Sequence, residues 1–501
     1  MESSYLNTQL PPELAETAQH LEKVARDNGL DFFPTIFEVV DYNQLNEIAA
    51  YGGFPTRYPH WRWGMEYERL AKTYQYGLAT IYEMVINNNP TYAYLMRANS
   101  MVIQKTVIAH VFGHGDFFKN NYWFKHTNRK MLDQMANHAS YVRKIIDQVG
   151  HDEVENFFDV CLSIENLIDV FSPFKAQSDK RDAGADDSSG RPKPVAKIKA
   201  KSYMDSYVNP KDFLAAQAKK QHEDVERERG FPENPERDIL KFLIDHAPMA
   251  GWQKRVLEIV RDEAYYFAPQ GQTKILNEGW ATYWHSQMMT RLAPLHESEI
   301  IDYCDNHAGV VASAQGQLNP YKLGLELLRH IERRWDRGQF GLDYLHCDDP
   351  RERAMWDKKS MLGKQKLFEV RKIHNDITFI DEFLDEDFCH ETKMFIYDFD
   401  RRANQYVISS RDFKEVKRRM LQQLTNFGQP IIQVVDGNFK NRGELLLRHS
   451  HDGIDLKHDF SLETLKNLHR IWQRPVHLET SLEDVGRRLS YDGTTHQVEK
   501  L

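Results

Sequence analysis

The sequence contains little cysteine. Four cysteines occur in 501 residues, and they lie far apart, at Cys161, Cys304, Cys347 and Cys389. No two of them form a Cys-x-x-Cys pair, so a cysteine zinc site is not indicated, and their scatter argues against the disulfide framework of a small secreted domain. We therefore expect a protein of a reducing compartment, the cytoplasm.

The chain also lacks long apolar runs and an excess of positive charge. No stretch of about 18 apolar residues occurs, and the N-terminus has no basic region followed by an apolar run, so we expect no integral membrane segment. The formal net charge is −9, which provides no general attraction to nucleic acid or to anionic lipid. We expect no nucleic-acid partner.

Apolar and aromatic residues are plentiful. Hydrophobic residues make up 41% of the chain and aromatic residues 12%, enough for a packed interior, and the length exceeds what one core supports. We expect an α+β protein with a large, mainly helical core domain formed by residues 1–173 and 238–392. A charged insertion at 174–237 and a C-terminal domain at 393–501 complete the predicted organisation.

Composition and pattern distinguish the last two parts. The insertion is rich in Asp, Ser, Gly, Pro and Lys with few large apolar residues, which is typical of a solvated, mobile linker. From residue 393 onward, short β-type runs alternate with two helical patterns in the order ββαββαβ. We expect this small α+β domain to bind or to regulate, since it shows no catalytic cluster.

The N-terminal part alternates helical and strand patterns. Residues 12–29 space apolar positions for an amphipathic helix that ends at Gly29. Residues 79–89 are β-rich and end in an Asn-Asn-Asn-Pro turn signal. The next segment, 91–114, is compatible with one long helix. We expect a strand, a turn and then this helix.

The helix predicted at 91–114 carries two histidines one turn apart, in the stretch "KTVIAHVFGH". His110 and His114 are at positions i and i+4, so both imidazoles can reach one ion at about 2.0–2.1 Å. A chain with 22 histidines also produces such a pair by chance. The spacing is therefore necessary for a shared metal, but not sufficient.

A third ligand is available in the stretch "ILNEGWATYWH". Glu278 is the candidate, and the small neighbours Gly279 and Ala281 would let another helix approach closely. His285 lies seven residues further on, almost two helical turns, and shares the face of Glu278. The sequence thus predicts a divalent-metal site, with Zn²⁺ as the expected ion, formed by His110, His114 and Glu278.

These pieces resemble the edge strand, zinc helix and third-ligand helix of gluzincin metallopeptidases, so we expect a zincin-like domain with a short edge strand. The HExxH motif of those enzymes places a glutamate beside the first histidine, and this chain has Val111 there. Another group must then move the proton of the bound water. The candidates are Glu83, His285 and His307.

Each catalytic candidate has a structural alternative. Glu83 would otherwise be a surface or strand-pairing carboxylate, and His285 and His307 would be hydrogen-bonded structural histidines. Asp116 follows the pair and is expected to orient an imidazole or to lie at a helix end.

Two neighbouring stretches carry aromatic and polar groups. Residues 58–70 place His60 among tryptophans and could line a cleft or simply pack. Residues 117–124 could hold substrate with Lys119, Asn120 and Asn121, or satisfy the end of the histidine helix.

The combination of "YPHW", "YEMVINNNP", "HVFGH", "FFKNNYWF", "NEGWATYWH" and "QLNPYKLG" closely resembles the SpoVR family, named for stage V sporulation protein R. The resemblance runs from about residue 12 into the C-terminal α+β domain. It implies a link to spore cortex formation or, in bacteria without spores, to a stress response. The implied partners are a PrkA-type serine kinase and a companion protein with a von Willebrand-like domain.

Two hypotheses follow from the sequence. The first is a cytoplasmic metal-dependent hydrolase that cleaves an amide bond in a peptide or a peptidoglycan precursor. The second is a non-catalytic adaptor in a complex that contains the serine kinase, which the absence of the usual glutamate base favours.

Overall fold

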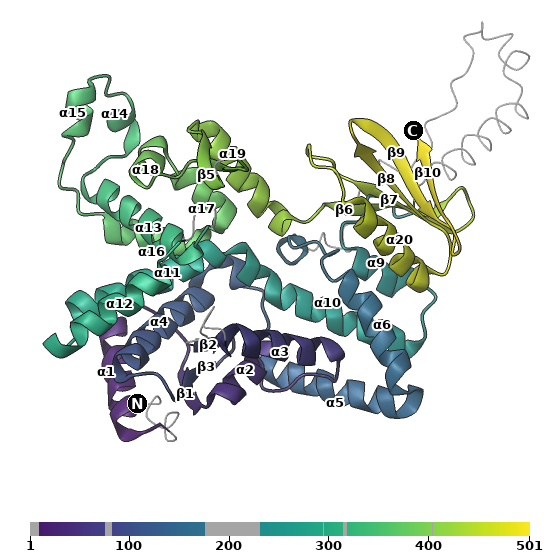
Figure 1. Cartoon of the computed structure of the whole chain (residues 1–501), viewed down its shortest axis with the longest axis horizontal. Helices are drawn as coiled ribbons and strands as arrows, with labels where there is room; N and C mark the ends of the chain where they lie inside the picture. The colour runs from purple at the N-terminus through teal and green to yellow at the C-terminus, as the bar shows by residue number, and fades with distance from the viewer. Residues whose placement is uncertain (1–9, 76–82, 176–230, 294, 314–317, 403) are drawn as a thin grey trace, which may run out of the picture. The chain divides into compact units, whose positions relative to one another are not determined.

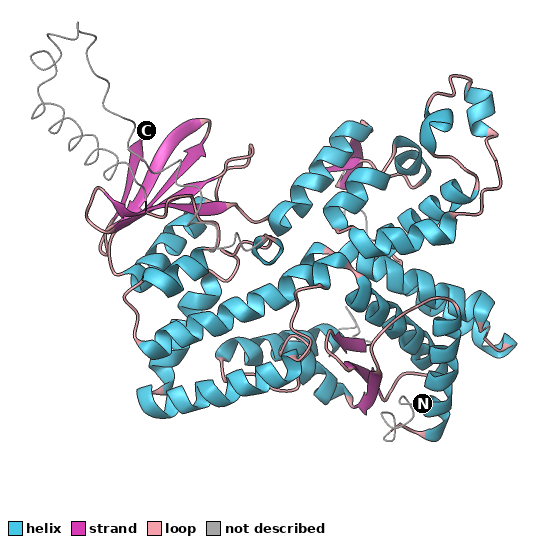
Figure 2. Ribbon diagram, turned by 180° about the vertical axis from the view of Figure 1, so that it is seen from behind, coloured by secondary structure: helices cyan, strands magenta, loops and turns pink. Residues whose placement is uncertain are grey.

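The structure is a computed structural model of the chain, and it describes residues 10–75, 83–175, 231–293, 295–313, 318–402 and 404–501 (Figure 1). The chain divides into two compact units. Unit 1 comprises Met1–Glu155 and Tyr265–Gln429, and unit 2 comprises Asn156–Ala264 and Pro430–Leu501. Helices dominate unit 1 and a β-sheet dominates the C-terminal part of unit 2 (Figure 2), which confirms the α+β class.

Unit 1 is mainly helical and contains one three-stranded sheet. Its helices are α1 (Pro12–Asp27), α2 (Tyr42–Ala50), α3 (Trp61–Gln75), α4 (Met101–Asn120), α5 (Met131–Val149), α11 (Lys274–Gln287), α12 (Ile300–Val310), α13 (Pro320–Asp336), α14 (Gly341–Leu345), α15 (Pro350–Ala354), α16 (Gly363–Ile373), α17 (Asp376–Phe383), α18 (Glu386–Glu391) and α19 (Phe413–Leu424). Its strands are β1 (Thr35–Val40), β2 (Glu83–Ile86), β3 (Thr91–Met96), β4 (Ile396–Asp400) and β5 (Gln405–Ser410). Two helices, α6 (His151–Ser163) and α10 (Gly251–Gln272), continue from one unit into the other.

Unit 2 is built around a five-stranded sheet in the order β10-β9-β8-β7-β6. Its own elements are α9 (Ile239–His246), β6 (Ile432–Phe439), β7 (Glu444–His449), α20 (His458–Trp472), β8 (Val476–Leu482), β9 (Val485–Tyr491) and β10 (His496–Lys500). Strands β7 and β8 are parallel, and α20 is the crossover that a parallel pair requires. The apolar side chains of α20, such as Leu465, Leu468 and Ile471, are fully buried.

The order ββαββαβ is present from β4 to β8, and two further strands, β9 and β10, follow it. Contacts group the hairpin β4–β5 and helix α19 with unit 1, and unit 2 begins its second segment at Pro430. The insertion predicted at 174–237 lies almost wholly outside the described residues. Glu236, at its end, forms a β-bridge with Val434 of β6.

The three-stranded sheet of unit 1 has the order β1-β3-β2, with β1 parallel and β2 antiparallel to β3. The prediction of one helix over residues 91–114 is wrong in its first part, because Thr91–Met96 form the central strand of this sheet. The β-branched and aromatic residues of "TYAYLM" suit a strand, and the helix begins only after Ser100, whose hydroxyl accepts a hydrogen bond from the Ile103 amide. The strand predicted at 79–89 is β2 where it is described, an edge strand as expected.

The two faces of this sheet are covered by different helices. Phe37 and Leu95 belong to one apolar core with α4, where the ring of Phe37 meets Phe112 edge-on at 5.6 Å. Tyr94 and Met96 belong to a second core with α2. The sheet therefore separates the α4 layer from the α2 layer.

Helix α11 is the central helix of the α4 layer, and small residues let its neighbours approach its backbone. A β-carbon on Gly113 of α4 would lie 2.7 Å from the Cα of Ala281. A β-carbon on Gly279 would lie 2.5 Å from the Cα of Gly324 in α13. The expectation that Gly279 and Ala281 accept another helix is confirmed on both sides of α11.

The N-terminus of α11 is capped by a carboxylate from a different helix. Thr273 at the N-cap makes no side-chain cap, and Asp376 accepts hydrogen bonds from the amides of Ile275 and Leu276, both at 2.9 Å. Burial raises the pKa of Asp376 to about 7, although these two amides lower it. The contact fixes the helix that carries Glu278 at its first turn.

We predict that Gly324→Ala lowers the free energy of unfolding by roughly 1–3 kcal/mol, the usual cost of overpacking. The new methyl group would collide with the backbone of Ile275 and Gly279, which cannot move without separating α11 from α13. Thermal melting followed by circular dichroism measures the change. Gly309→Ala is the matched control, since a β-carbon on Gly309 in α12 has no neighbour within 4 Å. Equal melting temperatures for the two variants would contradict the close approach of the helices.

Candidate metal centre

His110 and His114 lie on one face of α4, deep in unit 1. Their exposed fractions are 3% and 6%, and their ring centroids are 4.6 Å apart with the planes nearly perpendicular. The rest of this helix is also almost entirely buried, because α11 and the three-stranded sheet cover it. In this buried place the effective dielectric constant is low, so a charge between the two imidazoles interacts with them more strongly than it would in water.

Glu278 reaches the same point from α11. Its Oε2 atom lies 3.6 Å from Nε2 of His110 and 3.4 Å from Nε2 of His114. One ligand-capable atom from each of the three residues lies within 4.8 Å of the other two. The structure therefore brings the three predicted ligands together across more than 160 residues of sequence.

The spacing of these atoms fits one bound ion. A tetrahedral ion with bonds of about 2.0–2.1 Å separates its ligand atoms by about 3.3–3.4 Å. The two observed separations of 3.4 and 3.6 Å are close to this value and longer than a charge-assisted hydrogen bond of about 2.7–2.9 Å. Within the described part of the chain, Oε2 of Glu278 is buried without a hydrogen bond of normal geometry.

Residues outside the trio orient both imidazoles. Nδ1 of His114 is 2.9 Å from Oδ1 of Asn277, and an amide oxygen only accepts, so Nδ1 carries the proton. Nε2 of a neutral His114 then presents a lone pair toward Glu278. A lone pair facing a carboxylate repels it, so this contact needs a positive charge, which either a proton on Nε2 or a metal ion between the two groups supplies.

His110 is oriented by a chain of two further histidines. Nδ1 of His110 lies 2.9 Å from Nδ1 of His285, and Nε2 of His285 lies 3.1 Å from Nδ1 of His307. The ring of Tyr303 stacks on His307 at 5.7 Å. His285 is buried and His307 half-buried, so the chain leads from the trio toward the surface.

Burial and neighbouring charges set the protonation of this region. Burial alone would raise the pKa of Glu278, but the imidazoles of His114 and His110 outweigh it and lower the pKa well below its usual range. Burial lowers the pKa of His285 strongly, and the neighbouring His110, His307 and Arg329 lower it further. Glu278 is thus held as a carboxylate and His285 as a neutral imidazole.

The three catalytic candidates occupy different places. His285 contacts Nδ1 of His110, and His307 contacts His285 on the far side. Glu278 lies at the Nε2 side of His110. Glu83 lies in the edge strand β2 and pairs through its backbone with Leu95 of the central strand β3, and its side chain lies outside the described structure. Val111, which replaces the usual glutamate, is fully buried in the apolar core.

Asp116 fastens α4 to its neighbours. Its carboxylate accepts the Asp31 amide at 2.8 Å and the Trp280 indole N–H at 2.9 Å, and it lies 3.3 Å from Nε of Arg371. Burial raises its pKa to about 6, against the lowering effect of Arg371. Among the described residues no hydrogen bond joins Asp116 to an imidazole, so it positions helices and not the ligands.

The polar residues at the end of α4 form ion pairs and hydrogen bonds with other parts of unit 1. Lys119 forms an ion pair with Asp31 at 2.6 Å. Asn120 donates to the backbone oxygens of Asp31 and Asp116, and Asn121 donates to those of Arg371 and His374. These bonds support the capping alternative for residues 117–124.

Sequence reasoning missed two groups at the site. Asn277 orients His114, and the only signal was its position directly before Glu278. Tyr321 of α13 stacks on His110 with ring centroids 6.1 Å apart, and its only sequence signal is its place in the stretch "QLNPYKLG". Neither role follows from spacing along the chain.

Comparison with known proteins identifies the family. The sequence profile described as "SpoVR like protein" matches residues 9–429, and that described as "SpoVR-like C-terminal domain" matches residues 430–483. The chain is 30% identical over 499 residues to "Uncharacterized protein YcgB" of Escherichia coli (strain K12), covering 93% of this chain and 91% of the relative. No solved structure matches the chain. No helix in the described part combines the length and the apolar composition needed to cross a bilayer. The chain belongs to the SpoVR-like family.

Proposed function

We propose that the protein is a cytoplasmic metal-dependent hydrolase that acts on an amide bond of a peptide or of a peptidoglycan precursor. The observation that carries the proposal is the convergence of His110, His114 and Glu278 within 4.8 Å. Two histidines and one glutamate are a ligand set of catalytic zinc sites, which keep the fourth position open for water or substrate. Zn²⁺ is therefore the proposed ion.

The surrounding elements support a zincin-like arrangement. The antiparallel edge strand β2, the histidine helix α4 and the glutamate helix α11 follow one another as in gluzincins. When bound, the metal would lower the pKa of a coordinated water and polarise the scissile carbonyl. Asn277 and His285 hold the imidazoles in the orientation that this chemistry needs.

Proton transfer is assigned to groups other than residue 111. Val111 has no basic atom, so Glu83 on the edge strand is the proposed base for the attacking water. His285 and His307 would hold a proton at Nδ1 of His110, since their nitrogens form a continuous chain that begins at this atom, and Nε2 would thereby stay free to bind the metal. Spore cortex formation or a stress response is the proposed setting, by family resemblance.

The second candidate function is an adaptor. The buried Val111 in place of a base favours it, because a metal centre without proton transfer would only stabilise the fold. The proposed partners are then the PrkA-type serine kinase and the companion protein with the von Willebrand-like domain.

We predict that the purified protein contains about one equivalent of zinc, and that His110→Ala and Glu278→Ala each lose it, since two remaining ligands do not complete a site. Metal content by inductively coupled plasma mass spectrometry measures this. His20→Ala, at an exposed position of α1, is the control and should keep its metal. Equal metal content in all four proteins would exclude the site.

We predict that Asn277→Ala weakens zinc affinity about 10- to 100-fold without removing a ligand, the usual effect of losing a partner that orients a histidine. Competition with a chromogenic chelator measures the affinity. Asn137→Ala, on the exposed face of α5, is the matched control. An unchanged affinity in Asn277→Ala would show that the amide does not orient His114.

We predict that the zinc-loaded protein cleaves an amide bond in a panel of peptides and muropeptides, and that Glu83→Gln lowers the rate by roughly 10²- to 10⁴-fold while metal remains bound. His307→Ala should slow the reaction less, because His307 contacts His110 only indirectly, through His285. Product analysis by mass spectrometry measures cleavage. If zinc is bound and every substrate stays intact, the adaptor function replaces the hydrolase.

A further inference from the structure

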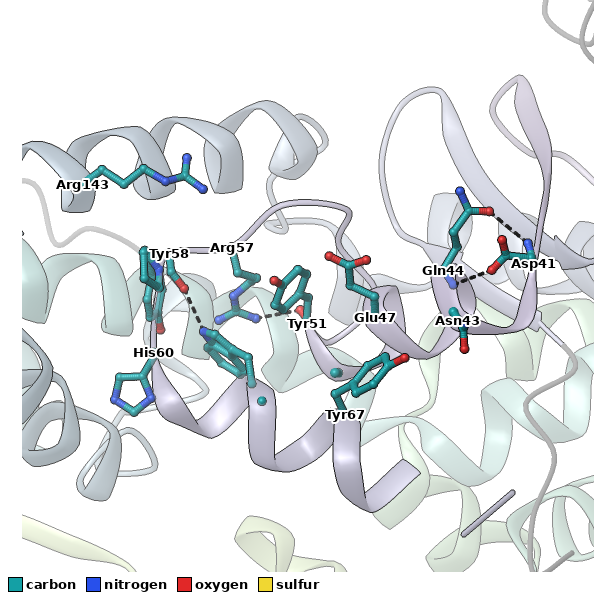
Figure 3. A pocket seen from close by; sticks show the side chains of 14 residues that line it. Asp41, Asn43, Gln44, Glu47, Tyr51, Arg57, Tyr58, His60, Tyr67 and Arg143 are labelled. Atoms are coloured by element: carbon teal, nitrogen blue, oxygen red, sulfur yellow. Dashed lines mark hydrogen bonds between the residues drawn. The ribbon is translucent and has the colours of Figure 1, made fainter. Parts of the chain in front are cut away.

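A hollow of about 570 Å³ opens in unit 1 between α2, α3 and α5. This volume is in the range of small-molecule sites. Its lining includes no residue of α4 or α11, so the hollow is distinct from the candidate metal centre. The stretch around His60, which the sequence suggested as a cleft lining, forms part of it (Figure 3).

Aromatic side chains form the wall of this hollow, and hydrogen bonds to backbone atoms hold them in place. Arg57 donates to the carbonyl of Tyr51 at 3.0 Å, and its guanidinium lies 4.2 Å from the ring centroid of Trp63. The indole N–H of Trp63 donates to the carbonyl of Tyr58 at 3.0 Å. Tyr67 of α3 completes the wall. A lining fixed in this way is ready for a ligand without reorganisation.

Two of the charged side chains at the hollow are already engaged. Asp41 accepts the Gln44 amide at 2.9 Å and caps α2, and Arg57 is held as described above. Glu47 of α2 and Arg143 of α5 are different. Within the described part of the chain, neither has an ion pair or a side-chain hydrogen bond, and they reach the hollow from separate helices (Figure 3).

Gly64 of α3 lies in the lining of the hollow and leaves space beside it. A β-carbon at this position of α3 would have no neighbour within 4 Å. Glycine is unfavourable inside a helix by about 1 kcal/mol relative to alanine, and Gly64, the fourth residue of α3, is a weaker helix former than alanine would be there. The empty space beside it is room for a ligand atom.

We propose that this hollow binds a short peptide with free termini, its ammonium group at Glu47, its carboxylate at Arg143 and an apolar side chain against the tyrosines and Trp63. The charges of the lining balance, with two carboxylates and two guanidiniums. A phosphate-rich ligand would be repelled by Asp41 and Glu47, and a simple cation by Arg57 and Arg143. A zwitterionic ligand can pair its positive group with Glu47 and its negative group with Arg143.

Calorimetric titration of the full chain with di-, tri- and tetra-alanine tests the proposal. The titration is made in the presence of a chelator, so that the outcome does not depend on the proposed metal. We expect saturable one-to-one binding for at least one length. For an exposed ion pair with hydrogen bonds, N-acetylation or C-terminal amidation should weaken binding about three- to tenfold.

Pairing protein and ligand changes identifies the contacts. Glu47→Gln should weaken binding of the peptide with free termini as much as N-acetylation of the peptide does. The same substitution should not weaken binding of the acetylated peptide further. Arg143→Gln should behave in the same way toward the amidated peptide. Glu68→Gln and Lys144→Gln, which change exposed neighbours outside the lining, should bind like the unchanged protein.

Gly64→Leu provides a second test, which changes the space in the hollow and not its charge. Leucine is a better helix former than glycine and its β-carbon meets no neighbour, so the variant should fold normally and place its side chain in the hollow. We expect it to abolish binding at millimolar peptide. Absence of binding by all three peptides, or undiminished binding by Gly64→Leu, would overturn the proposal.

Discussion

The distance between the backbones of α4, α11 and α13 is the constraint on which the rest of unit 1 depends. Side chains on packed helices usually keep the axes about 8–10 Å apart. Here Gly113 faces Ala281 and Gly279 faces Gly324, so the backbones themselves are in contact on both sides of α11. This approach brings a carboxylate of α11 within reach of two imidazoles of α4.

The cluster of His110, His114 and Glu278 gathers two imidazoles and one carboxylate at a largely buried place. Asn277 engages Nδ1 of His114 and His285 engages Nδ1 of His110, which leaves Nε2 of each imidazole to face the carboxylate. Burial makes such an arrangement costly unless a positive charge compensates it. Positive charge at the imidazoles of His114 and His110 also keeps Glu278 ionised, although burial alone would raise its pKa.

The sequence predicted those parts of the site that depend on local geometry. The i and i+4 spacing places His110 and His114 on one face, and the small residues beside Glu278 indicate a close helix contact. The roles of Asn277 and Tyr321 depend on how separate helices rotate against one another, which no local pattern records. The strand at Thr91–Met96 was missed because a short apolar run fits either a strand or a buried helix, and only its pairing with β1 and β2 decides.

The cap that Asp376 places on α11 has a consequence for synthesis on the ribosome. Asn277 emerges 163 positions after His114, which at about 5–20 residues per second is a delay of roughly 10–30 s. Asp376 comes later still, so the nascent chain exposes the apolar flank of α4 long before its partner helix is anchored. A growing polypeptide of this kind needs protection from aggregation, and the three side chains can meet only once α11 has been synthesised.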